Sequence, residues 1–339
     1  MEGHLKNIYI LEACSHLIRL LIYHIRWLIA RFSNRYIDTY KCLVGKTAII
    51  TGGSTGLGYA TATMLASRGC KIIIATNIEC EAEELNLIEA TNNPNITTKY
   101  LDLSSFASIR QFVEDVKKTE TKIDFLVNNA GVALIPEIVS KDKLNNVMQI
   151  NYFGHFLLTH LLIDELKAAE SAHVAFVASS SAYCNQADFH QINELPKENH
   201  QITSEEIFQY YTFSKLCVII AVQEFGKHLN KKYGITVNAV DPGILNTNIV
   251  HNVLRNEAPR AWFFKILFHF LLTLYSTDVF QAAKNTTYVL TADDINNGDY
   301  YFQCKPIFKP HYAYNPEFCE EIWKRSQTIV ELTPDEKLS

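Results

Sequence analysis

The sequence lacks a basic excess, a metal-binding cysteine pattern, internal repeats and low-complexity segments. Its 31 Lys and Arg stand against 36 Asp and Glu, and the net charge of −5 leaves no surplus to neutralise phosphates, which excludes sequence-wide nucleic-acid binding. The 8 Cys are scattered, without a CxxC pair or a Cys/His pair at zinc spacing. We therefore expect reduced, buried thiols in a protein that faces the cytosol, and no metal site.

What the chain does have is the material for a folded core. Apolar residues make up 48% of its 339 residues and charged residues 20%, a globular composition that excludes disorder over most of the chain. The length fits one large α/β domain with extensions, or two small domains.

A mostly apolar segment lies at residues 8–30. Its length is that of a membrane anchor or signal peptide, but no small-residue cleavage site follows it. On a helix, Glu12, Arg19 and Arg26 fall on one narrow stripe and leave a broad apolar face. This pattern favours a helix lying in a membrane interface, although packing on the protein's own surface or on a dimer mate would also bury that face. If the segment spans the bilayer, the basic residues around and after it hold the rest of the chain on the cytosolic side.

The middle of the chain alternates short apolar runs with helical patterns. Strands are predicted at residues 46–51, 70–75, 98–101, 125–127, 174–177 and 235–240, and helices at 57–68, 79–90, 105–119, 143–168 and 212–231. This alternation predicts an α/β fold with a single doubly wound parallel sheet and helices on both faces. We expect that domain to span 44–310, between an N-terminal segment, 1–43, and a C-terminal surface helix with a loose polar tail, 311–339.

A glycine-rich turn follows the first predicted strand, with the sequence Thr51-Gly52-Gly53-Ser54-Thr55-Gly56-Leu57-Gly58. Glycines at a strand-to-helix junction permit a tight turn and close approach of the backbone to a pyrophosphate, which then sits on the helix N-terminus. A plain connecting turn would also explain them, but the position at the first strand favours a dinucleotide site.

The TGxxxGxG spacing of this turn resembles that of the short-chain dehydrogenase/reductase family. The resemblance extends over about residues 44–305 and is carried further by Asn128-Asn129-Ala130-Gly131, Tyr211-x-x-x-Lys215 and Asp241-Pro242-Gly243 with Thr247. The stretch from Asn151 to Thr159 resembles the branch of retinol dehydrogenase-like and WW-domain oxidoreductase-like proteins, in which an N-terminal apolar anchor is common.

The resemblance implies a Rossmann-type fold, an NAD(P)-dependent oxidoreductase and a set of cofactor-binding residues. That set is Gly52, Ser54, Thr55, Gly56, Leu57, Gly58, Asn77, Asp102, Leu103, Asn129, Ala130, Gly131, Tyr211, Lys215, Pro242, Gly243 and Thr247. Within it, Asp102 matches a residue that contacts adenine in the family, but it would equally serve as the N-cap of the next helix.

Tyr211 and Lys215 have the chemistry that an alcohol/carbonyl reaction needs. A proton must move to or from the substrate oxygen, and the usual tyrosine pKa of about 10 is too high for a base at neutral pH. A lysine four residues on, on the same helix face, lowers that pKa, as does an oxidised nicotinamide. We place this pair at a helix start, and the resemblance also assigns Lys215 to the nicotinamide ribose. The neighbouring Tyr210 has no lysine at this spacing.

Two further catalytic candidates complete the set implied by the resemblance. Ser179, just after a predicted strand, would polarise the substrate oxygen, with Ser180 as the rival because a one-residue slip is invisible in a single sequence. Asn151 would hold a water in a proton relay to Lys215, although a core hydrogen bond would explain it nearly as well.

The cofactor position at the end of the second strand carries neither usual signature. An acid there binds the ribose 2′-hydroxyl of NAD, and a base binds the 2′-phosphate of NADP, but here the residues are Ala75-Thr76-Asn77. The resemblance favours NADP(H) over NAD(H), since relatives of this branch usually carry an arginine near Asn77.

The substrate side is expected in a lid at about residues 244–276, where 262–272 is intensely apolar. A lid over a lipophilic pocket, touching the membrane, is one interpretation, and a core or dimer helix is the other. The first predicts a retinoid-, steroid- or aliphatic aldehyde-like substrate. Separately, the apolar N-terminal segment and the resemblance lead us to expect a membrane-associated enzyme on the endoplasmic reticulum, with its folded domain in the cytosol. The alternative function is a catalytically silent, membrane-associated scaffold that retains the fold. The resemblance also allows a homodimer.

Overall fold

The computed structural model describes residues 36–133, 135, 137–185, 192, 203–245 and 276–338. They form an eight-stranded sheet in the order β3-β2-β1-β4-β5-β6-β7-β8, parallel throughout except for the antiparallel edge pair β7 and β8. Its strands are β1 (Thr47–Thr51), β2 (Lys71–Thr76), β3 (Ile96–Tyr100), β4 (Phe125–Asn128), β5 (His173–Val177), β6 (Thr236–Asp241), β7 (Tyr300–Phe302) and β8 (Lys305–Ile307). The predicted parallel sheet is confirmed, and β1 to β6 end within two residues of the expected positions, whereas β7 and β8 were not predicted.

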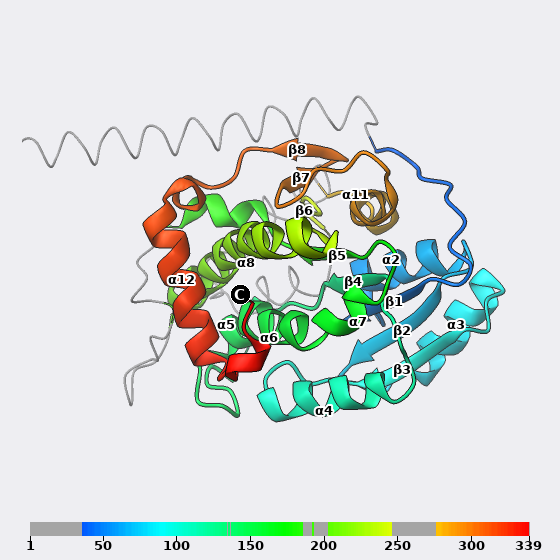
Figure 1. Ribbon diagram of the computed structural model, residues 1–339, viewed down its shortest axis with the longest axis horizontal. Helices are drawn as coiled ribbons and strands as arrows, with labels where there is room; N and C mark the ends of the chain where they lie inside the picture. The colour runs from blue at the N-terminus through cyan, green and yellow to red at the C-terminus, as the bar shows by residue number, and fades with distance from the viewer. Residues whose placement is uncertain are drawn as a thin grey trace, which may run out of the picture.

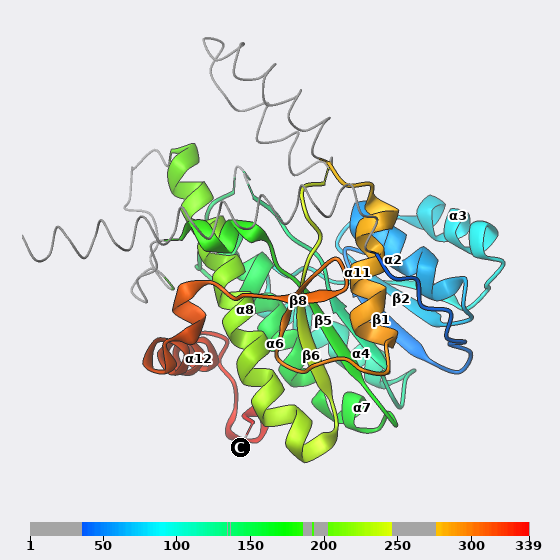
Figure 2. The same cartoon turned by 90° about the horizontal axis from the view of Figure 1, so that it is seen from above.

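Helices cover both faces of this sheet, as Figures 1 and 2 show. On one face α2 packs against α11 and α3, and on the other α4 and α8 lie with α6, while α12 adds an outer layer on α8. These helices are α2 (Gly56–Ala66), α3 (Glu81–Thr91), α4 (Phe106–Lys117), α6 (Gly154–Leu161), α8 (Ser204–Tyr233), α11 (Val279–Thr291) and α12 (Pro316–Ile329). The central strands are buried on both sides, which explains their continuous apolar runs.

The prediction of a single regular helix over 143–168 is wrong, because this part of the chain is divided into four helical elements. A short α5 (Asn146–Met148) leads into a π-helical turn, η1 (Gln149–Phe153), then α6, and after Leu162 the short α7 (Ile163–Lys167). A π-turn accommodates one extra residue and re-aims the side chains around it, and such turns are frequent at functional sites. Here it contains Asn151.

The helix carrying Tyr211 and Lys215 begins earlier than expected. A capping box between Thr203 and Glu206 starts α8 at Ser204, so Tyr211 lies two turns inside the helix rather than at its start. The helix runs without interruption to Gly234, whose φ of +68° ends it in the left-handed region. Tyr211 is therefore held on a continuous, capped helix.

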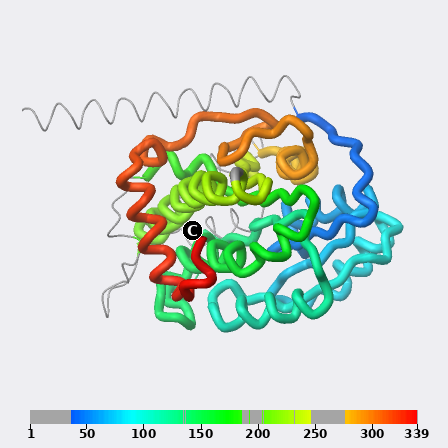
Figure 3. The backbone as a smooth tube through the Cα atoms, viewed as in Figure 1, coloured from blue at the N-terminus to red at the C-terminus, as the bar shows by residue number. Residues whose placement is uncertain are grey.

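The C-terminal region is not the loose tail that we expected. α12 buries Phe318, Ile322 and Trp323, and beyond the helix Val330 and Leu332 are buried as well. The tube drawing in Figure 3 shows this last stretch running back along the domain, where Arg110 of α4 pairs with Glu336. The few apolar residues of this otherwise polar stretch therefore pack it against the domain.

Several expectations fall outside the described residues, namely the N-terminal segment 8–30, Thr247 and most of the lid at 244–276. No helix in the described ranges combines the length and the apolar character needed to cross a bilayer. The described cysteines are free thiols, and most are buried as expected, but Cys42 and Cys184 are exposed.

Candidate active site

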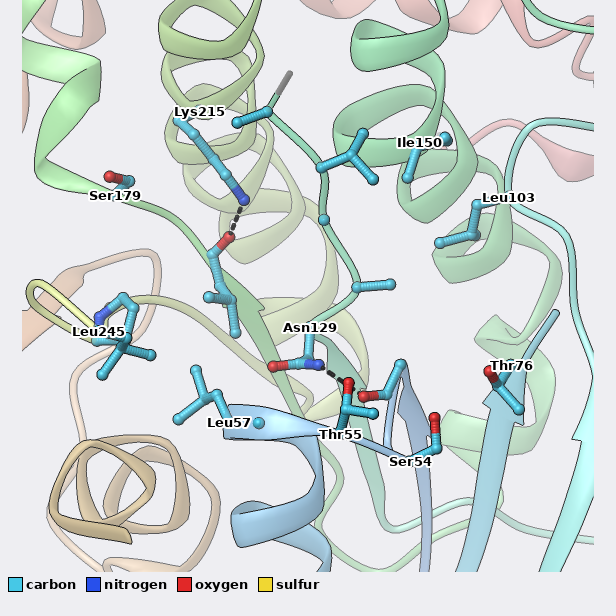
Figure 4. A pocket seen from close by; sticks show the side chains of 18 of the residues that line it. Ser54, Thr55, Leu57, Thr76, Leu103, Asn129, Ile150, Ser179, Lys215 and Leu245 are labelled. Carbon is cyan, nitrogen blue, oxygen red and sulfur yellow. Dashed lines mark hydrogen bonds between the residues drawn. The ribbon is translucent and has the colours of Figure 1, made fainter. Parts of the chain in front are cut away.

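A cleft of about 790 Å³ opens at the carboxyl ends of the central strands (Figure 4). It brings together most of the residues predicted from sequence. Its lining includes Gly52, Ser54, Thr55, Gly56, Leu57, Asn77, Asp102, Leu103, Asn129, Ala130, Gly131, Ser179, Tyr211, Lys215, Pro242 and Gly243. Two other predicted residues, Gly58 and Asn151, support the lining from behind without forming part of it.

The glycine turn is built for close backbone approach. Gly52 has a φ of +62°, in the left-handed region, and a Cβ on Gly58 would lie 2.6 Å from the Nδ2 atom of Asn129. That Nδ2 donates to the carbonyl oxygens of Thr51, at 2.8 Å, and Gly52, at 3.3 Å. The amide at the end of β4 therefore fixes the turn at the end of β1, and side chains at these glycines would break that contact.

The start of α2 is prepared for an anion. Its N-cap residue, Thr55, makes no side-chain capping bond, and no acidic residue lies in the first turn. The first backbone N–H groups of a helix have no partners within the helix, so they and the helix dipole face the cleft. The donor set and the glycine cradle fit the pyrophosphate of a dinucleotide.

Tyr211 and Lys215 lie one above the other on α8, with the Nζ atom of Lys215 5.8 Å from the centre of the Tyr211 ring. The same Nζ donates to the carbonyl oxygen of Val177, at 2.8 Å. Burial lowers the pKa of Lys215 to about 8, and the negative charge of Asp241 opposes that shift. The lysine is therefore largely protonated at neutral pH and supplies a buried positive charge beside the phenol.

Ser179 contacts the phenol of Tyr211. Burial raises the pKa of Tyr211 above its ordinary value, the hydrogen bond with Ser179 lowers it, and the charge of Asp241 raises it again. Ser180 also lines the cleft, but the side-chain hydrogen bonds that lower the pKa of Tyr211 come from Ser179 and, with a smaller effect, from Ser181. This geometry favours Ser179 over its neighbour as the partner of the tyrosine.

Asn151 is buried and its side chain is fully engaged. Its Oδ1 accepts from the N–H of Val132 at 2.8 Å, and its Nδ2 donates to the carbonyl of Val132 at 2.8 Å and to Ser214 Oγ at 3.1 Å. A Cβ on Gly131 would lie 3.3 Å from Asn151 Oδ1 and 3.5 Å from Lys215 Nζ. Asn151 thus holds the backbone that runs beneath Lys215.

At the far end of the cleft, Asp102 does not cap the next helix. Ser105 is the N-cap of α4, whereas Asp102 accepts from Ser104 and forms an ion pair with Lys141, at 2.7 Å. Burial raises the pKa of Asp102, but the hydrogen bonds from Lys141 and Ser104 outweigh it and bring the pKa below its ordinary value. The N-cap alternative is therefore wrong.

Sequence reasoning missed much of the apolar wall of this cleft. The residues missed are Ile78, Ala133, Ile135, Ile150 and Val279, whereas Ile244 and Leu245, which also line the cleft, belong to the segment 244–276 that was expected on the substrate side. Several of them follow strand ends, which is the one signal that could have found them. Among the described lining residues, Asp102 and Lys215 carry the charges, so the rest of the wall suits an uncharged, apolar ligand.

Comparison with known proteins gives consistent results. The model of the short chain dehydrogenases matches residues 46–190. Retinol dehydrogenase 13 of Mus musculus is 33% identical over 293 residues, which cover 85% of this chain and 84% of that protein. Polyprenol dehydrogenase of Homo sapiens is 31% identical over 295 residues, covering 83% and 84%. A crystal structure of an uncharacterised Mycobacterium paratuberculosis protein, 22% identical, superposes with a TM-score of 0.64 over 85% of this chain and 94% of that chain. That likeness is one of fold.

Proposed function

This chain belongs to the short-chain dehydrogenase family, and from that premise we propose that it interconverts a lipophilic alcohol and the corresponding carbonyl compound. It is a retinol dehydrogenase-like oxidoreductase that acts on CH–OH or C=O groups, and its family uses NAD(P). The observation that carries the proposal is the meeting of Tyr211, Ser179 and Lys215 at one end of the cleft.

The glycine cradle, the start of α2 and Asn129 would hold the dinucleotide. NAD(P) supplies or accepts the hydride at its nicotinamide. The phosphates fit the backbone N–H groups around Gly56 and Leu57, and Lys215, with two donors left after its bond to Val177, would bind the nicotinamide ribose. Gly131 has no side chain to fill the space beside Asn151 and Lys215, which keeps this part of the cleft open.

In this proposal, Tyr211 moves the proton. During reduction its hydroxyl donates a proton to the carbonyl oxygen as hydride reaches the carbon, and during oxidation the phenolate takes the proton of the alcohol. Ser179 holds the substrate oxygen beside the phenol, and the positive charge of Lys215, whose Nζ lies 5.8 Å from the centre of the Tyr211 ring, favours the phenolate that forms. Asn151 keeps the backbone under this group in place.

A lipophilic substrate is supported by the apolar wall near Tyr211. Ile135, Ile244 and Leu245 line the same cleft as Tyr211 and offer an alkyl or polyene chain a surface without charges. Two of the relatives are named for retinol and polyprenol, both long apolar alcohols. We also propose the membrane association, the endoplasmic-reticulum location with a cytosolic domain and the homodimer that the sequence and its resemblance suggested.

For the cofactor, the resemblance favours NADP(H), while the described lining near Asn77 offers a 2′-phosphate no cation. Thr76 and Asn77 are uncharged and lack the acid that selects NAD. We therefore expect both dinucleotides to bind, and the family resemblance leads us to expect the higher affinity for NADP(H).

Two measurements test the function. Purified protein is titrated separately with NADPH and NADH, following nicotinamide fluorescence, and then assayed with a retinoid aldehyde. The variant Tyr211→Phe should bind the dinucleotide like the wild type and lose turnover by about 100-fold or more, whereas the neighbouring variant Tyr210→Phe should keep its activity. Wild-type-like turnover in Tyr211→Phe would overturn the mechanism, and a wild type that binds neither dinucleotide would favour the scaffold alternative.

A further inference from the structure

A buried histidine lies behind the cleft and belongs to no part of the site described so far. His155 is on the first turn of α6 and is 1% exposed. Its Nε2 lies 2.9 Å from the hydroxyl of Thr51, at the end of β1, and its Nδ1 lies 3.2 Å from the carbonyl oxygen of Asn151, in the π-turn. The ring therefore bridges the cofactor turn and the helix that carries Asn151.

The two contacts define the tautomer of this ring. A carbonyl oxygen only accepts, so Nδ1 carries the proton and donates it to Asn151. Nε2 is then the bare nitrogen, and the hydroxyl of Thr51 donates to it. Burial lowers the pKa of His155 to about 3, which keeps the ring neutral and this arrangement intact.

Thr51 connects His155 to residues 129–130, which line the cleft. Its oxygen accepts from the backbone N–H groups of Asn129, at 2.8 Å, and Ala130, at 3.0 Å. Its hydroxyl hydrogen has two candidate acceptors, His155 Nε2 at 2.9 Å and the more distant carbonyl of Val127 at 3.3 Å. Donation to Val127 would leave the bare Nε2 of His155 without a donor, so the shorter contact favours His155 as the acceptor.

The same segment is held at its other end through Asn151. The side chain of Asn151 forms hydrogen bonds with both the N–H and the carbonyl of Val132. The backbone carbonyl of Asn151 accepts the hydrogen bond from His155 Nδ1. Residues 129–132 are therefore clamped from two sides by hydrogen bonds that converge on one imidazole. Within this stretch, Gly131 faces the Nζ atom of Lys215.

We propose that His155 is a positioning residue. As a neutral, Nδ1-protonated ring it accepts a hydrogen bond from Thr51 and so fixes residues 129–132. It thereby positions the part of the site that would bind the nicotinamide end of the dinucleotide. This inference rests on the proposed function. His155 touches neither cofactor nor substrate, and it acts through Thr51 and Asn151.

The chain supplies a matched control on the same helix. His160 is also buried and donates from Nδ1 to a backbone carbonyl, that of Phe156, at 2.9 Å. Its Nε2, however, finds no partner in the described part of the chain, and the ring packs against Phe225 and Trp323 away from the cleft. Replacing it removes a core histidine without touching the clamp.

The experiment compares His155→Phe, Thr51→Val, the double variant and His160→Phe, each titrated with NADPH or NADH at a temperature where it is folded. We expect the dinucleotide Kd to rise about three- to tenfold in each single clamp variant, as expected for the loss of one or two buried hydrogen bonds. The double variant should be no worse than the worse single variant, because both break one chain of bonds. The Kd of His160→Phe should stay within about twofold of the wild type, whatever its thermal stability.

A spectroscopic readout covers the case in which His155→Phe does not fold. The ¹⁵N spectrum of the wild-type histidine rings should contain one buried ring with Nδ1 protonated and Nε2 bare, and that Nε2 signal alone should shift in Thr51→Val and return in Thr51→Ser. The opposite tautomer, or a wild-type Kd in both His155→Phe and Thr51→Val, would overturn the inference while leaving the proposed function standing. A wild type that binds neither dinucleotide would overturn both.

Discussion

The Nζ atom of Lys215 donates a hydrogen bond to the carbonyl oxygen of Val177, 2.8 Å away, at the point where β5 ends (Figure 4). This bond uses one of the three ammonium donors and fixes the position of the buried charge next to Tyr211. The charge is expensive to bury, since burial lowers the pKa of Lys215 from 10.5 to about 8. Catalysis and stability therefore make opposite demands on this side chain.

We expect Lys215→Met to lose turnover and gain stability. Because the folded-state pKa lies below the unfolded one, the protonated lysine destabilises the fold at pH 7, and this cost fades as the pH rises from 8 toward 10.5. At about 1.4 kcal/mol per pKa unit, and after about 1 kcal/mol lost at the unpaired Val177 carbonyl, the net gain is about 2–3 kcal/mol. Urea unfolding at pH 7 measures it. A variant that is less stable than the wild type, or still active, would contradict this account.

The two serines after β5 should behave differently. Ser179 contacts the Tyr211 hydroxyl, so Ser179→Ala should lower kcat by about 100-fold or more while the dinucleotide Kd stays near the wild type. Ser180 lines the cleft without that contact, and Ser180→Ala should keep kcat within about threefold of the wild type. Steady-state kinetics of both variants decide the assignment, and the reverse ranking would move the role to Ser180.

The parts of the site that sequence predicted are those in which backbone geometry restricts residue choice. Gly52 adopts a positive φ, and a Cβ on Gly58 would collide with the carbonyl oxygen of Gly52 in the same turn, so both positions require glycine. The Tyr211–Lys215 spacing is likewise fixed by one turn of helix. Such constraints are local, and one sequence is enough to reveal them.

The parts that sequence missed depend on distant contacts. The apolar pattern over 143–168 continues through the π-turn and therefore does not reveal it. The turn occurs together with the hydrogen bonds between Asn151 and Val132, which lie far apart in the sequence. α11 escaped notice because Thr287 and Thr291 have poor helix propensity, yet their hydroxyls bond back to helix carbonyls and the helix packs on α2. Tertiary packing overrides local preference in both places.

Asn77 is the position at which the cofactor preference should be adjustable. It is exposed at the end of β2 and lines the cleft, where the described wall carries no base for a 2′-phosphate. We expect Asn77→Arg to tighten NADPH binding about tenfold and to leave NADH binding unchanged, since a charge-assisted contact to phosphate contributes about 1.5 kcal/mol. Fluorescence titrations at low and high salt check this, with Asn77→Gln as the uncharged control. Equal tightening of both dinucleotides would place the 2′-position elsewhere.

Two buried histidines should make the fold sensitive to acid. Burial lowers the pKa of His155 to about 3 and that of His160 to about 4, both below the ordinary 6.5. Between those values the unfolded chain binds protons that the folded chain refuses, so the stability is complete above pH 6.5 and falls as the pH drops toward 4. Each histidine contributes a slope of about 1.4 kcal/mol per pH unit in that range.

The contribution of His160 can be separated from that of the carboxylates. In His160→Phe the free energy of unfolding should change less steeply with pH between 6 and 4.5 than in the wild type. The difference in slope should correspond to about one proton, that is about 1.4 kcal/mol per pH unit. The carboxylates titrate alike in the wild type and in His160→Phe, so the difference between the two slopes reports the buried ring. An unchanged slope in His160→Phe would mean that His160 binds its proton in the folded state, against the apolar ring of Phe225, Trp323 and Phe156 around it.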